Sequence, residues 1–118
     1  MSPVTIRLAG APVEIRPLSF GSLRRILPRV AEGVAWYNLR LRDFPAFVAG
    51  ADAGLAIAVT MIAAATGRTE ADVEEIPATL MEGADAILAI ADLSGVLRKA
   101  GSEDTGPGEV MGVTSTGG

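Results

Sequence analysis

Carboxylates are the first candidates for a reactive or metal-binding site in this sequence, because it contains no histidine and no cysteine. Those absences exclude Ser-His-Asp and Cys-His catalysis and thiolate metal sites. Asp72, Glu74 and Glu75 are close in sequence, but a calcium site needs spaced oxygen ligands around a glycine turn, and this segment is predicted to begin a helix. Asp85 and Asp92 are seven residues apart and could share one helix face, yet no acid–base partner accompanies them. We therefore expect no enzymatic activity, no metal and no cofactor.

Positive charge is concentrated in the first third of the chain. Residues 1–42 contain seven arginines and two acidic residues, whereas residues 43–118 contain three basic and twelve acidic residues, so the two parts carry net charges of +5 and −9. This polarity favours head-to-tail self-association or an elongated charged partner, unless both sets of charges are solvated faces. Arg24, Arg25 and Arg29 are the candidate charged contacts. Nucleic acid is not expected, because the sequence pI is about 4.7 and no aromatic residues are interleaved with these arginines.

A β-hairpin followed by a helix is predicted for the first 42 residues. Apolar residues alternate with polar ones over 4–8 and 13–16, and turn residues occupy 9–12 between them. Ser19 is a candidate N-cap for the helix, and Pro28 inside it predicts either a kinked helix or two helices. An apolar stripe at helical period runs along this segment and consists of Leu23, Leu27, Val30, Val34, Tyr37 and Leu41.

A long apolar helix is predicted at the centre of the domain. It begins at Pro45 or Ala51, ends at Thr66 and is followed by Gly67, which suits the position after a helix C-terminus. Its most apolar stretch, residues 53–66, is shorter than the ~20 residues that a bilayer requires. The N-terminal residues also lack a secretory pattern. We therefore expect no membrane association and a cytoplasmic location.

Two further helices complete the predicted bundle. A short acidic helix is expected over 69–76, and a last helix over 79–99 with Arg98 and Lys99 in its final turn. The predicted fold is mainly α (α+β), with an N-terminal β-hairpin followed by a bundle of about four helices. Residues 1–101 are expected to form a single helical domain, and residues 102–118 a flexible Gly/Ser/Thr-rich tail.

Large aromatic side chains are few and lie close together. Trp36, Tyr37, Phe44 and Phe47 fall within twelve positions of a chain that is only 4% aromatic. One interpretation is that they form the core of the domain. The other is that some of them line a groove for a partner helix, where aromatic residues are favoured anchors. They are the candidate apolar contacts with a partner.

Two segments resemble the tail assembly chaperones of tailed bacteriophages and prophages. Residues 16–25 read RPLSFGSLRR and follow a short β-hairpin, as the RPL-(S/T)-(F/L)-G-x-L motif of that family does. Residues 65–77 read ATGRTEADVEEIP, which is similar to the family's helix end, short acidic helix and proline before a last helix. The likeness extends from residue 4 to about residue 101 and includes no catalytic signature.

The resemblance implies that this chain coats the long, helical, aggregation-prone tape measure protein during tail morphogenesis. It also implies recruitment of tail tube subunits, absence from the finished particle and an ability to form homo-oligomers. The family has no set of functional residues that could be transferred position by position.

Two alternatives to a chaperone remain open from the sequence. The chain could be a structural tail, neck or head-completion subunit that stays in the particle, with its hairpin extending a neighbour's sheet. It could also be a small adaptor or helical DNA-binding protein, which would bind nucleic acid in a salt-sensitive way.

Overall fold

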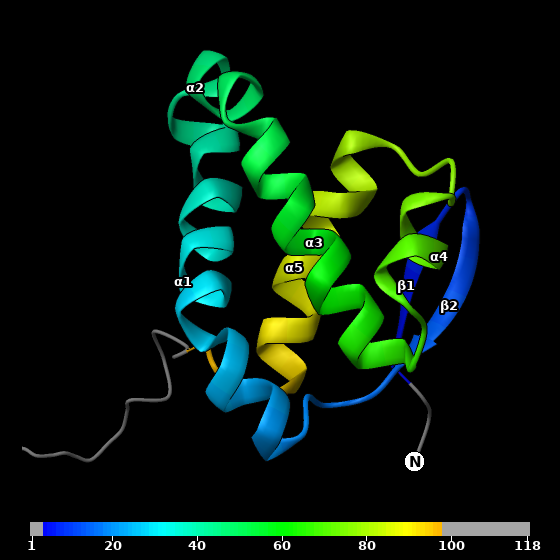
Figure 1. Ribbon diagram of the computed structural model, residues 1–118. Coiled ribbons are helices and arrows are strands. Elements are labelled where there is room, and N and C mark those ends of the chain that lie inside the picture. Colours follow the sequence, from blue (N-terminus) through cyan, green and yellow to red (C-terminus); the bar gives the residue numbers. More distant parts are fainter. Residues whose placement is uncertain (1–3, 98–118) are drawn as a thin grey trace, which may run out of the picture.

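The computed structural model describes residues 4–97, in which a β-hairpin and five helices form one mainly helical assembly (Figure 1). The expected fold class is confirmed. The predicted tail over 102–118 and the positions of Arg98 and Lys99 lie outside the described residues. The elements are β1 (Val4–Leu8), β2 (Ala11–Ile15), α1 (Phe20–Arg42), α2 (Phe44–Ala49), α3 (Ala51–Thr66), α4 (Glu70–Glu74) and α5 (Leu80–Leu93).

The hairpin has a tighter turn than the sequence predicts. Only Ala9 and Gly10 form the loop, with φ values of 55° and 78°, as the mirror-image turns of two-residue hairpins require. Ala11 and Pro12 belong to β2 instead, where Pro12 is paired with Arg7. A proline is tolerated there because β2 is an edge strand.

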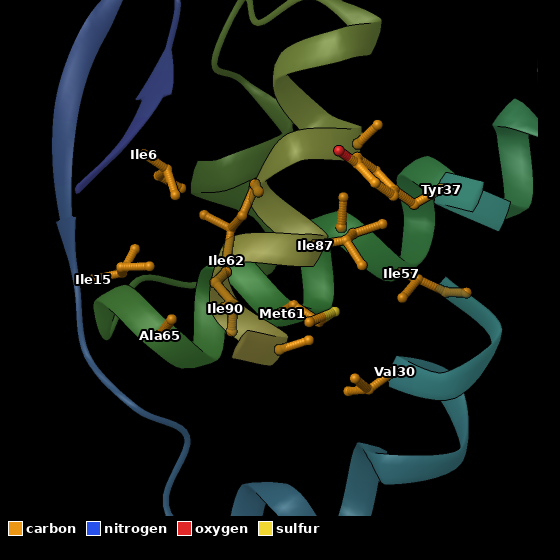
Figure 2. Packing of buried hydrophobic residues seen from close by; sticks show 14 of the residues in the cluster. Ile6, Ile15, Val30, Tyr37, Ile57, Met61, Ile62, Ala65, Ile87 and Ile90 are labelled. Carbon is orange, nitrogen blue, oxygen red and sulfur yellow. The ribbon is translucent and has the colours of Figure 1, made fainter. Parts of the chain in front are cut away.

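The apolar face of the hairpin is covered by helices of the same chain. Ile6, Leu8 and Ile15 are buried, and Figure 2 shows Ile6 and Ile15 directed toward the helices. The hairpin is also held through its backbone, because the N–H of Arg16 donates to the carbonyl of Ala65 at 3.0 Å. An isolated two-stranded ribbon is barely stable, so these contacts are what keep it folded.

Helix α1 is continuous through Pro28 rather than divided into two helices. The side chain of Ser19 accepts from the N–H of Ser22, which confirms the predicted N-cap. Of the predicted apolar stripe, Val30 and Tyr37 are buried and Leu23 and Val34 are partly buried against the core, whereas Leu27 and Leu41 are 44% and 81% exposed. The residues of α1 that are buried are Ile26, Val30, Gly33, Trp36 and Tyr37.

Gly33 lies at the centre of the buried face of α1, where no apolar side chain marks it in the sequence. A Cβ atom on Gly33 would lie 2.9 Å from Ile57 of α3 and 3.2 Å from Ile87 of α5. The two neighbouring helices therefore approach α1 closely at a residue without a side chain. Hydrophobic periodicity does not register a glycine as a contact residue, so the sequence pattern does not reveal this approach.

Helix α3 lies at the centre of the bundle, as predicted. It packs against both α1 and α5, which also contact each other, and α4 lies beside its C-terminal half (Figure 1). It begins at Ala51, because the preceding segment forms the separate helix α2, capped by Asp43. Gly67 ends α3 with a φ of 75°, which confirms the predicted C-terminal glycine. Figure 2 shows side chains of the hairpin, α1 and α5 around α3, and Met61 of α3 is wholly buried.

Helix α5 begins as predicted and ends earlier. Thr79 and Glu82 form the capping box at its start. The predicted continuation to Lys99 is wrong, because α5 ends at Leu93 and Gly95 follows with a φ of 77°. The N–H of Val96 then donates to the carbonyl of Ala91 at 2.9 Å, so the glycine turns the chain back on the helix end. Across residues 4–97, no helix combines the length and apolar character needed to traverse a bilayer.

Candidate functional site

Two of the predicted aromatic contacts are packed inside the domain. Trp36 is 6% exposed and its ring stacks on that of Phe47, with centroids 4.5 Å apart and planes 12° apart. The indole N–H of Trp36 donates to the carbonyl oxygen of Phe47 at 2.8 Å, so its polar atom is satisfied. Phe47 itself is wholly buried. In this conformation both rings contribute to the core between α1, α2 and α3.

The other two aromatic residues differ in exposure. Tyr37 is 9% exposed, and the guanidinium of Arg40 lies 4.3 Å from its ring centroid and donates to its hydroxyl at 2.6 Å. Phe44, at the start of α2, is 54% exposed, and its ring is tilted against that of Phe47 at 5.8 Å. Of the four aromatic candidates, Phe44 alone presents much of its ring at the surface.

The three candidate arginines of α1 do not form one patch. Successive residues of an α-helix are turned by about 100°, so Arg25 and Arg29 face away from the side on which Arg24 lies. Arg29 donates to the hydroxyl of Thr60 on α3 at 3.3 Å, and Arg25 donates to the hydroxyl of Ser22 at 3.4 Å. A partner that contacts Arg24 would therefore not reach Arg29 from the same side of α1.

A row of apolar residues follows the outer side of α1, and we call it the α1 row. It consists of Phe20, Leu27, Val34 and Leu41, each seven residues after the last. Phe20, Leu27 and Leu41 are 87%, 44% and 81% exposed, and Val34 is half-buried. Three of these residues belong to the apolar stripe that the sequence predicts. Phe20 was missed because it is the first residue of the helix.

Beside this row, α1 and α5 enclose a shallow hollow, which we call the α1–α5 groove. Its volume is about 610 Å³. Asp85 and Asp92 both line it, which confirms that these carboxylates share one face of their helix. The lining residues are Val34 and Asn38 of α1, Asp85, Leu88, Ala89 and Asp92 of α5, and Leu97 beyond it.

The charges on the two sides of the groove differ in sign. Arg24 and Arg42 of α1 are eighteen residues apart, which is five helical turns, so they project in the same direction. Arg24 and Arg42 point about 80° around the helix axis from Val34, and they lie on the opposite side of Val34 from the buried Val30. The α1 side of the surface is therefore basic, while Asp85 and Asp92 make the α5 side acidic.

A second hollow of about 360 Å³ lies between α3, α4 and the start of α5. Apolar side chains such as Leu55, Val59 and Ile76 contribute most of its lining, and Asp52 and Glu74 are the carboxylates that reach it. Its shape suits an apolar side chain better than a reaction, since nucleophile and acid–base groups do not converge there.

The carboxylate of Glu82 has a lowered pKa and serves a structural purpose. Backbone N–H groups of Thr79, Gly10 and Ala9 donate to Glu82 at 2.9, 3.0 and 2.9 Å and hold its pKa below the usual value. Glu82 thereby joins the start of α5 to the hairpin turn. Within residues 4–97, no group of three acidic side chains is arranged to hold a metal ion.

Comparison with known proteins adds no assignment, because no protein-family model, no curated protein and no solved structure matches this chain.

Proposed function

We propose that this chain is a tail assembly chaperone of a tailed bacteriophage or prophage, which binds and solubilises the tape measure protein during tail morphogenesis in the host cytoplasm. It acts by binding rather than by catalysis. Recruitment of tail tube subunits and homo-oligomer formation are part of the same proposal. The motifs at residues 16–25 and 65–77 support the family.

The observation that carries the proposal is the exposed α1 row beside the α1–α5 groove. A protein that keeps a long helical client in solution must cover apolar side chains that recur along helices. The α1 row offers apolar surface at the same kind of spacing, and Phe20 and Leu41 at its ends are more than 80% exposed. A helix-in-groove contact of this type is a common mode of peptide recognition.

Co-expression with the client tests the proposal. A tagged tape measure protein, which the proposal expects to be encoded near this chain, is produced with and without it, and solubility and co-purification are measured. The chaperone function requires that the client be soluble and retain this chain only when both are made together. A client that is equally soluble alone and retains nothing would end the proposal.

A structural subunit is the second candidate, and the hairpin favours it. Among residues 4–97, β1 and β2 pair only with each other, so each strand has a free edge that a neighbouring sheet could extend. Mass spectrometry of purified particles separates the two functions. A chaperone is absent from finished particles, whereas a structural subunit is recovered from them in fixed proportion to the other tail proteins.

A further inference from the structure

The hollow between α3, α4 and the start of α5, which we call the α3–α4 hollow, is apolar but lies in an acidic part of the surface. Leu55, Val59 and Ile76 are among its lining residues, together with the exposed carboxylates of Asp52 and Glu74. Neither carboxylate forms a hydrogen bond or an ion pair within residues 4–97. From residue 43 to residue 97 the sequence contains nine acidic residues and one basic residue. An occupant that suits this hollow therefore combines an apolar side chain with positive charge.

The start of α1 has both of these properties. Phe20 is 87% exposed, the highest value among the large apolar side chains of residues 4–97. Arg24 lies one turn later on the same face, because residues four apart in an α-helix are neighbours. The sequence from residue 15 to residue 31 contains four arginines and no acidic residue. Phe20 and Arg24 thus form an exposed pair, apolar and basic, which we call the α1 knob.

Within one chain the α1 knob cannot reach the α3–α4 hollow. The N–H of Leu18, two residues before Phe20, donates to the hydroxyl of Ser94 just beyond the C-terminal end of α5. The hollow lies at the other end of that helix, where Leu80 and Gly83 line it. The 14 residues of α5 span ~21 Å, and α1 and α4 lie on opposite sides of α3 (Figure 1). The knob and the hollow can therefore meet only between two copies.

We propose that copies of this chain associate head to tail, with the α1 knob of one copy in the α3–α4 hollow of the next. Phe20 covers the apolar lining, and Arg24 lies against Asp52 and Glu74. Because the two contacting surfaces differ, each pair keeps one free knob and one free hollow, so the contact continues into an array instead of stopping at a dimer. The inference rests on the proposed function for the use of this array, which spaces copies along an elongated client.

Charge complementarity selects this arrangement of two copies. Two knobs are both basic and two hollows are both acidic, so only the unlike pair brings opposite charges together. Leu41 lies ~32 Å along α1 from Phe20, so the far end of the α1 row remains available to the client in such an array.

The contact is small and the association should be weak. One aromatic side chain buries about 150–250 Å², whereas stable complexes bury roughly 1,200 Å² or more. We therefore expect a dissociation constant on the order of 100 μM for free copies. Binding of several copies to one client would raise their effective concentration and strengthen the array.

Sedimentation velocity of the full chain in low salt, from about 10 μM to about 1 mM, measures the association. The wild type should form species that grow in size with concentration, and added salt should return it toward the monomer. Phe20→Glu should weaken association by at least about tenfold, because it replaces the apolar contact by a charge of the same sign as the hollow. Leu41→Glu is the matched control, since Leu41 is 81% exposed on the same helix, and it should associate as the wild type does.

A second set of variants tests the hollow. The double variant Asp52→Arg/Glu74→Arg should also lose association, because it places positive charge against Arg24. Glu14→Arg/Glu32→Arg changes the net charge equally at exposed positions outside the hollow and should associate at least as strongly as the wild type. A 1:1 mixture of Phe20→Glu with the Asp52→Arg/Glu74→Arg variant should form dimers and nothing larger, since one intact knob and one intact hollow remain. Thermal melts establish that each variant is folded.

Each of the other outcomes refutes the contact. A wild type that is monomeric throughout would overturn it, and uptake of a labelled Phe/Arg peptide by that monomer would assign the hollow to another protein. Association that Leu41→Glu abolishes and Phe20→Glu does not would assign it to the rest of the α1 row. A mixture that stays monomeric, after each variant alone has lost association, would mean that like surfaces meet.

The sedimentation experiment contains no client, so its result is separate from the chaperone function. A client that co-purifies with Phe20→Glu as it does with the wild type would leave that function standing even if the copies do not associate. Arrays that form while no client co-purifies would refute the function and leave the head-to-tail contact in place.

Discussion

Replacing Gly54 by alanine tests whether the Trp36 ring is packed on α3 as the structure places it. A Cβ atom at position 54 would lie 2.3 to 2.5 Å from three ring carbons of Trp36, closer than any real contact. The ring is held from its other side by stacking on Phe47 and by its hydrogen bond of 2.8 Å to the Phe47 carbonyl. The ring therefore has little room to move, so either its hydrogen bond must break or α3 must move away from α1.

Two opposing effects set the size of the change. Forcing an extra methyl group into a packed core costs about 1–3 kcal/mol, and weakening the indole hydrogen bond costs about 1 kcal/mol more. Alanine in place of glycine inside a helix stabilises the folded state by about 0.5–1 kcal/mol. We therefore expect Gly54→Ala to lower the free energy of unfolding by about 2 kcal/mol, which corresponds to roughly 10 °C in melting temperature for a domain of this size.

Denaturation in urea, followed by circular dichroism and by Trp fluorescence, measures this loss, and Trp36 is the only tryptophan in the chain. Gly21→Ala in the first turn of α1 is the matched control, because the nearest atom to its added Cβ is the Ser19 hydroxyl at 4.0 Å. The control should be neutral or slightly stabilised. If Gly54→Ala were as stable as the control, with unchanged Trp36 emission, the packing of α3 on this ring would be refuted.

Three further predictions concern the attachment of the hairpin and of α5. Because its pKa is lowered in the folded state, Glu82 contributes stability that is present above its usual pKa and lost as the pH falls through the lowered value. Glu82→Gln should therefore be less stable than the wild type at neutral pH and should lose less stability on acidification. Thermal melts across that pH range measure both effects. Ser94→Ala removes the acceptor of the Leu18 N–H, 2.9 Å away, and should cost about 1–2 kcal/mol in urea denaturation, whereas Ser94→Thr should retain most of that stability. Ala9→Asn should stabilise the domain by up to about 1 kcal/mol, because asparagine tolerates a φ of 55° better than alanine does, and an unchanged or lower melting temperature would contradict the turn geometry.

Local signals in the sequence were enough to predict most of the elements. Capping residues such as Ser19 and Thr79 and the glycine at position 67 act within one turn of the chain, so the positions at which they begin or end helices can be read directly. The end of α5 was missed because Gly95 was followed by apolar residues that continue the helical pattern, whereas its positive φ turns the chain there.

The orientation of α1 and the placement of the aromatic residues depend on distant contacts and could not be predicted. Which side of α1 is buried is decided by Gly33, whose missing side chain admits α3 and α5. Trp36 is in the core because Gly54, eighteen residues later, leaves space for its ring. The link from Glu82 to the Gly10 N–H likewise joins residues 72 positions apart. A pattern within one segment contains no information about such pairs.

Site-specific photo-crosslinking within the co-expressed complex tests the central claim most directly. A photoreactive amino acid is placed at position 41, in the α1 row, or at position 4, on the hairpin, and the chain is illuminated in the presence of the long helical client. The account predicts a covalent adduct with the client from position 41 and none from position 4. A client that co-purifies with the chain but crosslinks only from position 4, or equally from both, would contradict it.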